Sequence, residues 1–311
     1  MDPRERFTLK PGDFELVSEP VTKFNPNHDS NGRFAGGGAG GGGGAGVMVP
    51  PSANPRPGMG DIVLDENTVA EMQGGSAGKH IVKDANGNYM FTPERQALHD
   101  KLVKESVDGI PSSDNPTYVI MGGGPASGKS SILDSGAISL PKNTVEVNAD
   151  VFKQKLPEWG NGGPGVSSQV HAESSYLAKR TQAAAFERKQ NVVLDGTGNT
   201  SVASMNKKID TAKANGYTVE ANYVSLPTEM AIPIAAARAL KTGRDVPETF
   251  IRSQHAGVSQ TFPAIAHKFD SVKLYDTSIK GKPRLVVSGG KGKVNIVDQK
   301  LYNTFLAKGN E

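Results

Sequence analysis

The sequence contains no cysteine in 311 residues. Disulfide bonds, zinc–thiolate sites and iron–sulfur clusters are therefore excluded, because each of them needs cysteine sulfur. No apolar run approaches the roughly 20 residues needed to cross a bilayer. The N-terminal segment MDPRERFTLKPGDFE has no apolar stretch behind its charges, which argues against a Sec signal peptide. We expect a soluble protein of a reducing cytoplasm.

The sequence also lacks an excess of charge of one sign. Its 35 basic residues nearly balance 32 acidic ones, for a net charge of +3. Bulk charge of this size gives no footprint for nucleic acid or for a membrane surface. We therefore expect neither of these as a partner.

Glycine, in contrast, is abundant, with 37 residues. Nearly every residue between Ala35 and Gly46 is glycine, and the proline-rich stretch VMVPPSANPRPGMG follows. Such a chain is costly to order and buries little apolar surface. Residues 1–60 are therefore predicted to be a disordered tail and Gly/Pro-rich linker. Within it, the turn-rich segment 24–34 can alternatively be interpreted as a short docking peptide.

Folded structure is predicted from residue 61 onward. Residues 80–91 have the pattern of a β-hairpin, and Thr92 with Pro93 opens a helix, so 61–111 is predicted to be an accessory hairpin and helix. From Thr117 onward, strands are predicted at 118–121, 144–147, 191–194, 217–226 and 273–275. Helices are predicted between them, including a long one at 167–189. This alternation predicts an α/β fold, a parallel sheet with helices on both faces.

The segment GGPASGKS, Gly123 to Ser130, matches the phosphate-binding pattern G-x-x-x-x-G-K-[ST]. A strand precedes it and a helix start follows it, as this motif requires. Lys129 is predicted to reach the β- and γ-phosphates of ATP, and Ser130 to bind Mg²⁺. The predicted ATP-binding residues are Gly123, Gly124, Pro125, Ala126, Ser127, Gly128, Lys129, Ser130 and Ser131. A P-loop NTPase-like domain is predicted over 112–280, with C-terminal strands and a helix at 281–311.

Two aspartates follow predicted strands. Asp150 is placed to take the proton of an acceptor hydroxyl, and Asp195 to bind a water of the Mg²⁺ ion. Both also have a structural interpretation: Asp150 suits a helix N-cap, and Asp195-Gly196 suits a turn. Thr197 is equally consistent with substrate contact and with turn chemistry.

Other candidates lie on the helices. Arg238 and Arg244 flank a glycine hinge and could neutralise transition-state charge, although a single arginine is usually a surface residue. His171, Glu173 and Ser174 begin the long predicted helix. His171 and Ser174 share a helix face and could line the acceptor pocket, whereas a lone helical histidine is more often structural.

Taken together, the segments GGGPASGKS, VNADVFKQKLP, VVLDGTGNT and RALKTGRDVP resemble the zeta toxin family of P-loop kinases over roughly 117–277. The hairpin and the segment FTPERQALHD resemble the lead-in of zeta-type domains carried by phages and mobile elements. The resemblance implies an ATP- and Mg²⁺-dependent kinase that phosphorylates a sugar hydroxyl of UDP-N-acetylglucosamine and so blocks cell-wall precursor synthesis in a bacterial host. A separate antitoxin chain could accompany it.

The same resemblance implies a role for each site residue. Lys129 and Ser130 would bind ATP and Mg²⁺, and Asp150 would handle the acceptor hydroxyl. Thr197 would contact the substrate. Arg238 and Arg244 would contact the phosphates.

Two alternatives remain open from the sequence. One is a P-loop kinase for another acceptor, such as a nucleotide, an antibiotic hydroxyl or a polynucleotide end; the near-neutral charge disfavours the last of these. The other is a virion-associated structural or cargo protein whose N-terminal tail docks to a phage capsid and carries a kinase fold.

Overall fold

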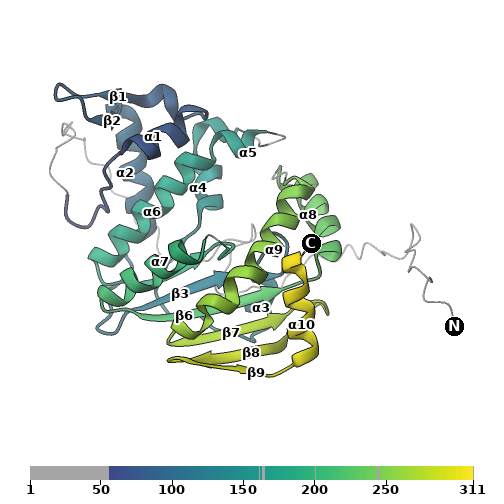
Figure 1. Ribbon diagram of the computed structural model, residues 1–311. Helices are drawn as coiled ribbons and strands as arrows, with labels where there is room; N and C mark the ends of the chain where they lie inside the picture. Colours follow the sequence, from purple (N-terminus) through teal and green to yellow (C-terminus); the bar gives the residue numbers. More distant parts are fainter. Residues whose placement is uncertain (1–55, 161, 163–164, 200, 244–245, 311) are drawn as a thin grey trace. The chain divides into compact units, whose positions relative to one another are not determined.

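The computed structural model describes residues 56–310 of the chain, except residues 161, 163–164, 200 and 244–245. Most of the predicted tail therefore lies outside the described residues, together with the 24–34 segment. The described part contains a seven-stranded sheet in the order β4-β5-β3-β6-β7-β8-β9 and a separate hairpin of β1 and β2 (Figure 1).

Five strands of the large sheet are parallel and coincide with the five predicted ones. They are β3 (Thr117–Gly122), β4 (Thr144–Val147), β5 (Asn191–Asp195), β6 (Thr218–Ser225) and β7 (Ser271–Asp276). β3 lies between β5 and β6, with Met121 opposite Asp195 and Gly122 opposite Tyr223. The predicted α/β architecture is confirmed, and the carboxyl ends of these strands meet at one edge of the sheet.

The C-terminal segment extends the same sheet. β8 (Arg284–Gly290) pairs antiparallel with β7, and β9 (Lys293–Ile296) pairs antiparallel with β8. The helix α10 (Gln299–Ala307) places Phe305 in the main apolar core. β8 and β9 thus belong to the same sheet as the five parallel strands, and α10 packs into the same core.

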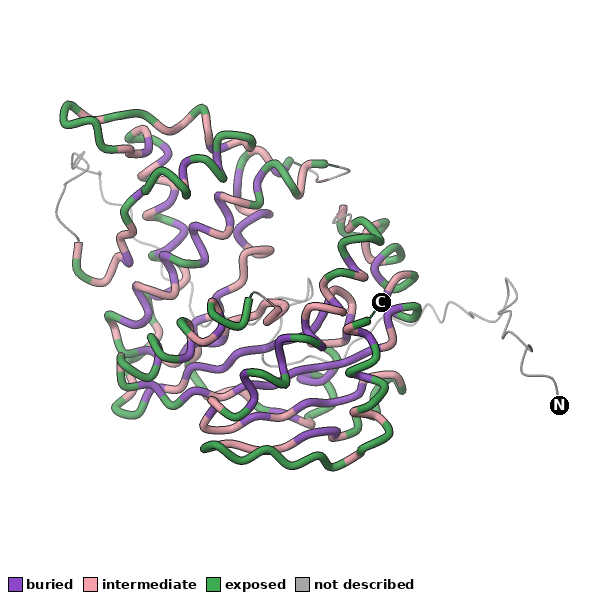
Figure 2. The backbone as a smooth tube through the Cα atoms, viewed as in Figure 1, coloured by how far each residue is buried: buried purple, intermediate pink, exposed green. Residues whose placement is uncertain are grey.

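The two faces of the sheet carry different layers. Val219, Ala221 and Tyr223 of β6 point into the main core, and because side chains alternate along a strand, Glu220 and Asn222 point to the opposite face. The main-core face is covered by α6 (His171–Glu187), α7 (Val202–Ala214) and α9 (Glu248–Ile265). Figure 2 shows buried residues along the strands and the inner sides of these helices. On the opposite face, the loop that follows the short helix α3 (Lys129–Asp134) lies against Glu220 and Asn222.

The long helix predicted at 167–189 is two helices. α5 (Val166–Gln169) ends at Val170, whose φ of −97° and ψ of 2° depart from helical values, and α6 begins at the next residue. Val170 is fully buried. Leu177 and Ala184, seven and fourteen residues further on, are equally buried. The apolar spacing thus runs on from Val170 as it would in one continuous helix, and the sequence pattern conceals the break.

The accessory segment packs on α6. It contains α1 (Glu66–Gln73), the hairpin of β1 (Ile81–Lys83) and β2 (Tyr89–Phe91), and α2 (Pro93–Val107). As predicted, Thr92 precedes α2 and Pro93 is its first residue. Leu102, Val103 and Val107 of α2 join the main core, while the hairpin and α1 form a smaller apolar cluster with Tyr176 of α6.

Buried charges lie between α2 and α6. Glu173 of α6 is 1% exposed, and its carboxylate accepts hydrogen bonds from Arg95 at 2.5 and 2.7 Å and from His99 Nε2 at 2.6 Å. Arg95 also pairs with Glu158 at 2.7 Å. Burial lowers the pKa of His99, so its ring is neutral at pH 7 and donates from Nε2. Buried charges of this kind are stable only when they are paired.

A second cluster of charges fixes the start of the described chain. Arg180 of α6 is 0% exposed and donates to Asp61 at 2.9 Å and Asp100 at 3.0 Å. Arg56 pairs with the same two carboxylates at 2.8 and 2.6 Å. The predicted tail boundary at residue 60 is therefore too late, because Arg56 already belongs to the packed structure.

We expect Arg180→Met to destabilise the protein. The substitution leaves Asp61 and Asp100 with Arg56 as their remaining arginine partner, and removing one member of a buried ion pair typically costs about 3–5 kcal/mol. Because both carboxylates are about a fifth exposed, we expect about 2–4 kcal/mol, measured by urea unfolding. The control, Arg252→Met, breaks two exposed ion pairs, with Glu229 and Glu248, and should lose clearly less stability because solvent screens such pairs. Equal losses would contradict a structural role for the buried cluster.

Stability should also fall in mild acid. The pKa of His99 is lowered from 6.5, so below about pH 6.5 the unfolded chain binds more protons than the folded one, and the free energy of unfolding decreases. Burial would raise the pKa of Glu173, but His99 and Arg95 lower it below 4.5, so its contribution is lost in turn at lower pH.

The variant His99→Gln isolates the contribution of His99 to this pH dependence, because glutamine can donate to Glu173 without taking a proton. Urea unfolding between pH 7 and pH 5 should show a smaller loss of stability in His99→Gln than in the wild type. Parallel curves for the two proteins would show that His99 does not titrate on unfolding.

Candidate active site

The predicted phosphate-binding motif forms the loop between β3 and α3. Gly128 has a φ of 90° and immediately precedes α3, whose first residue is Lys129. Gly123 has a φ of 141° and donates its N–H to the carbonyl of Thr197 at 2.9 Å. Glycine adopts these angles without strain. The strand, loop and helix therefore follow the order that the motif requires.

The loop is packed tightly against α9. His255 is 1% exposed, and its Nε2 donates to the carbonyl of Pro125 at 2.9 Å. A Cβ atom on Gly124 would lie 2.3 Å from the His255 ring, so residue 124 has no room for a side chain. Burial lowers the pKa of His255 to about 4, which keeps the ring neutral at pH 7.

Thr277, just after β7, holds the other side of the loop. Its hydroxyl lies 2.6 Å from the carbonyl of Ser127 and 3.0 Å from that of Ser225, the last residue of β6. Neither Thr277 nor His255 was identified from the sequence. His255 lies on the apolar stripe of α9 that includes Ile251 and Val258, and a buried polar residue on such a stripe is the one signal that could have revealed it.

Lys129 lies beside the end of β5. Its ammonium donates to the carbonyl of Gly123 at 3.1 Å and lies 4.0 Å from the Asp195 carboxylate. The amide of Asn148 donates to the other oxygen of Asp195 at 3.2 Å. Because the strands are parallel, the residues that follow β3 and β4 both contact Asp195 at the end of β5.

Asp150 lies in the first turn of α4 (Ala149–Lys155). The N-cap is Asn148, whose side chain accepts the Asp150 N–H at 3.0 Å. The N-cap interpretation of Asp150 is therefore wrong. Its carboxylate instead pairs with Lys153 at 3.2 Å. Asp150 follows β4, the neighbour of β5, and β5 ends at Asp195.

The predicted Mg²⁺ ligands suit that ion. Ser130 is exposed at the start of α3, and Asp195 supplies a carboxylate at the same sheet edge. Among the described residues, no group of three or more His, Cys, Asp or Glu side chains could hold a metal. Mg²⁺ usually takes one or two protein oxygens and completes its shell with water and substrate phosphates.

The Thr197 segment is held by polar contacts. The Thr197 hydroxyl donates to the Asn199 side chain, and the Asn199 amide donates to Gln254 of α9 at 2.8 Å. With the bond between Thr197 and Gly123, these contacts attach the segment to the phosphate-binding loop. A direct contact of Thr197 with substrate remains a prediction.

Of the two predicted arginines, Arg238 belongs to the described residues. Arg238 lies half-buried in the C-terminal half of α8 (Thr228–Thr242), and its carbonyl accepts the Thr242 hydroxyl at 3.0 Å. Arg244 lies outside the described residues. Their role in binding phosphates remains a prediction.

The group of His171, Glu173 and Ser174 is not a common acceptor surface in this structure. Glu173 and Ser174 are 1% and 0% exposed, and the Ser174 hydroxyl donates to the His171 carbonyl at 2.8 Å. Glu173 is bound by Arg95 and His99, so its role is structural. His171 is the first residue of α6. Burial and the charge of Lys153 lower its pKa, and the charge of Asp150 raises it by less.

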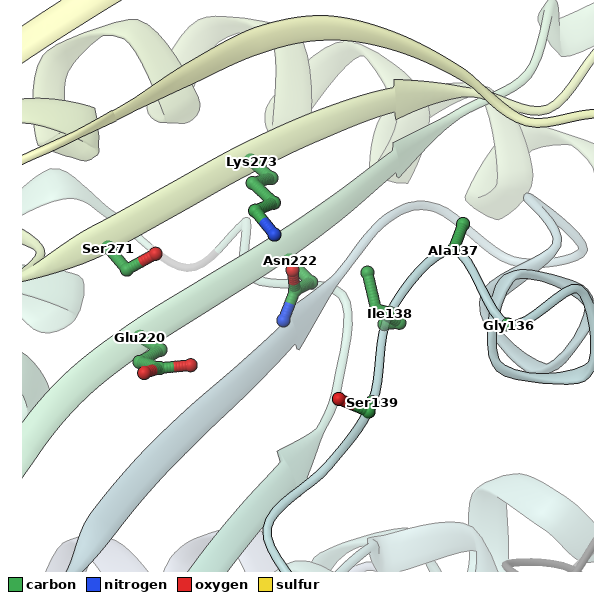
Figure 3. Close-up of a pocket in the computed structure, with 8 residues that line it drawn as sticks. All are labelled: Gly136, Ala137, Ile138, Ser139, Glu220, Asn222, Ser271 and Lys273. Carbon is green, nitrogen blue, oxygen red and sulfur yellow. The ribbon is translucent and has the colours of Figure 1, made fainter.

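A polar cavity of about 310 Å³ lies elsewhere, on the opposite face of the sheet (Figure 3). Residues of β6 and β7 and the loop after α3 form its walls. Lys129, Asp150 and Asp195 are not among its lining residues: Gly136, Ala137, Ile138, Ser139, Glu220, Asn222, Ser271 and Lys273. The cavity is thus separate from the candidate site.

None of the helices in the described part of the chain has the length and apolar character needed to cross a membrane.

Comparison with known proteins connects this arrangement to a family. A model of the family described as "Zeta toxin" matches residues 100–291, more than half of the chain. Toxin zeta of Enterococcus hirae is 27% identical over 137 residues, and Toxin zeta of Streptococcus pyogenes is 26% identical over the same length. These alignments cover 42% of this chain and 46% of each relative. The chain thus spans about half the length of the curated relatives it matches.

Solved structures share the fold. The complex of AvrRxo1-ORF1 with AvrRxo1-ORF2, crystallised with ATP, aligns with a TM-score of 0.59 at 23% identity, over 75% of this chain and 82% of that one. The PezAT chromosomal toxin–antitoxin system of Streptococcus pneumoniae aligns with a TM-score of 0.52 at 17% identity, over 71% of this chain and 95% of that one. With the match over 100–291 and the arrangement of the phosphate-binding loop, these findings lead to one conclusion: the chain belongs to the zeta toxin family.

Proposed function

We propose that this protein is an ATP-dependent kinase that transfers the γ-phosphoryl group of ATP to a sugar hydroxyl of UDP-N-acetylglucosamine, and so depletes a cell-wall precursor. The observation that carries the proposal is the contact of Lys129 with Asp195 at the carboxyl edge of β3 and β5, with Asp150 in the first turn of the helix that follows β4. The substrate is the one that the resemblance of the sequence to zeta toxins implies.

At the nucleotide end, the loop 123–128 and Lys129 would bind the phosphates. The Lys129 ammonium contacts a loop carbonyl and the Asp195 carboxylate, and the β- and γ-phosphates would compete for the same charge. Ser130 and Asp195 would hold Mg²⁺, which neutralises phosphate charge when bound. Support comes from the similar complex of AvrRxo1-ORF1 with AvrRxo1-ORF2, whose structure was determined with ATP.

At the acceptor end, Asp150 would orient the sugar hydroxyl. The hydroxyl oxygen forms a bond to the γ-phosphorus, the bond from that phosphorus to the β–γ bridging oxygen breaks, and ADP leaves. Asp150 accepts the hydroxyl proton. Arg238 and Arg244 would neutralise charge on the transferring group, and Thr197 would contact the acceptor.

We also propose that a separate antitoxin chain binds this protein. Support comes from the similar PezAT structure, which its title describes as a toxin–antitoxin system. Co-expression with a chain that binds this protein as an antitoxin should relieve growth inhibition by the active kinase. Unchanged inhibition would argue against this partner.

The function is tested by incubating the purified chain with γ-labelled ATP, Mg²⁺ and a panel of UDP-sugars, nucleotides and aminoglycosides. Label should appear on UDP-N-acetylglucosamine. Transfer to a different member of the panel would keep the kinase and replace the acceptor, and no transfer at all would overturn the proposal.

Lys129→Ala and Asp195→Asn should each lower transfer by at least about 10²-fold, the usual effect of removing a transition-state electrostatic contact. Lys129→Ala should also weaken ATP binding in calorimetry, because the lysine contacts the phosphates directly. The control Lys142→Ala alters an exposed lysine before β4 and should leave both quantities unchanged. Full activity in Lys129→Ala would refute the nucleotide site.

Asp150→Asn should bind ATP normally and lose transfer by about 10²–10⁴-fold, because asparagine keeps the shape of the side chain but cannot take a proton. The control Asp210→Asn changes an exposed aspartate that pairs with Lys268 and should transfer as the wild type does. If Asp150→Asn instead loses its Mg²⁺ dependence and binds ATP poorly, Asp150 is a metal ligand and Asp195 becomes the candidate base.

A further inference from the structure

Lys153 of α4 is buried, which is unusual for a lysine. It is 8% exposed, and lysines are almost never buried unless they are paired. Its ammonium contacts two groups: the Asp150 carboxylate at 3.2 Å and the Ser167 hydroxyl at 3.1 Å. Burial of this charge therefore depends on the aspartate predicted to handle the acceptor.

The position of Lys153 follows from the helix. Residues three apart lie on one face, so Lys153 reaches the carboxylate one turn earlier. Ser167 belongs to α5, so the same ammonium connects α4 with the start of the α5–α6 pair. Burial lowers the pKa of His171, and the nearby charge of Lys153 lowers it further.

We infer that Lys153 is a positioning residue that holds Asp150 in the orientation needed to receive the acceptor hydroxyl. This inference rests on the proposed kinase function. Phosphoryl transfer depends mostly on positioning and electrostatics rather than on the strength of the base. A fixed carboxylate is therefore worth more than a freely rotating one, and a misplacement of about 1 Å can cost roughly 10²-fold in rate.

The chain offers a matched control in the same helix. Lys155 lies two residues further on and pairs with Glu105 of α2 at 3.5 Å, away from Asp150. Both lysines form one ion pair from α4, but Lys153 alone of the two contacts the predicted acceptor residue. A general effect of removing a positive charge from α4 would appear in both variants.

The first measurement is steady-state transfer by Lys153→Met and Lys155→Met, with rates divided by the number of ATP-binding sites counted in calorimetry. Lys153→Met should lower kcat by about 10- to 100-fold while the KM for ATP changes less than about twofold. Lys155→Met should match the wild type. Equal kcat in Lys153→Met and the wild type would overturn the inference, as would equal losses in the two variants.

The second measurement needs no acceptor. Thermal unfolding midpoints are compared for Asp150→Asn, Lys153→Met and the double variant. If the two side chains act as a pair, the double variant loses less than the sum of the two single losses. Strictly additive losses would overturn the inference. If the wild type transfers to no acceptor in the panel, the proposed function fails. The comparison of the single and double variants then decides on its own whether Lys153 holds Asp150.

Discussion

The parallel pairing of β3 with β5 on one side and β6 on the other determines where the phosphate-binding loop and Asp195 lie. Parallel strands end at the same edge, so Gly122, Asp195 and Ser225 finish side by side although more than 100 residues separate the first from the last. The phosphate-binding loop follows β3, so it starts between the end of β5, at Asp195, and the end of β6, at Ser225. A shift in register would separate Lys129 from Asp195 even if each local segment kept its structure.

Most of the fold was predictable because its signals are local. Short β-branched runs mark β4 and β5, and a glycine-rich loop between a strand and a helix marks the nucleotide end. The structure confirms those strands and brings Asp195 beside Lys129. In contrast, the break at Val170 has no sequence signal, since a buried residue at that position suits a continuous helix equally well.

Contacts between distant segments could not be predicted in this way. Thr277 reaches Ser127 across 150 positions, and His255 reaches Pro125 across 130. Glu173 was placed at the acceptor because of its neighbours in sequence, but Arg95 and His99, more than 70 residues away, engage it in the interior. A charged residue in a helix has the same pattern whether its partner is a substrate or a buried arginine.

The contact between Gly124 and His255 has a consequence for how this sequence can change. A side chain on residue 124 would overlap the imidazole ring, and the ring in turn bonds the loop carbonyl at Pro125. Residue 124 therefore cannot accept a side chain while His255 stays as it is. The two sites therefore form a single evolutionary unit, in which a smaller residue at 255 would have to precede any larger one at 124, at the cost of the bond that holds the loop.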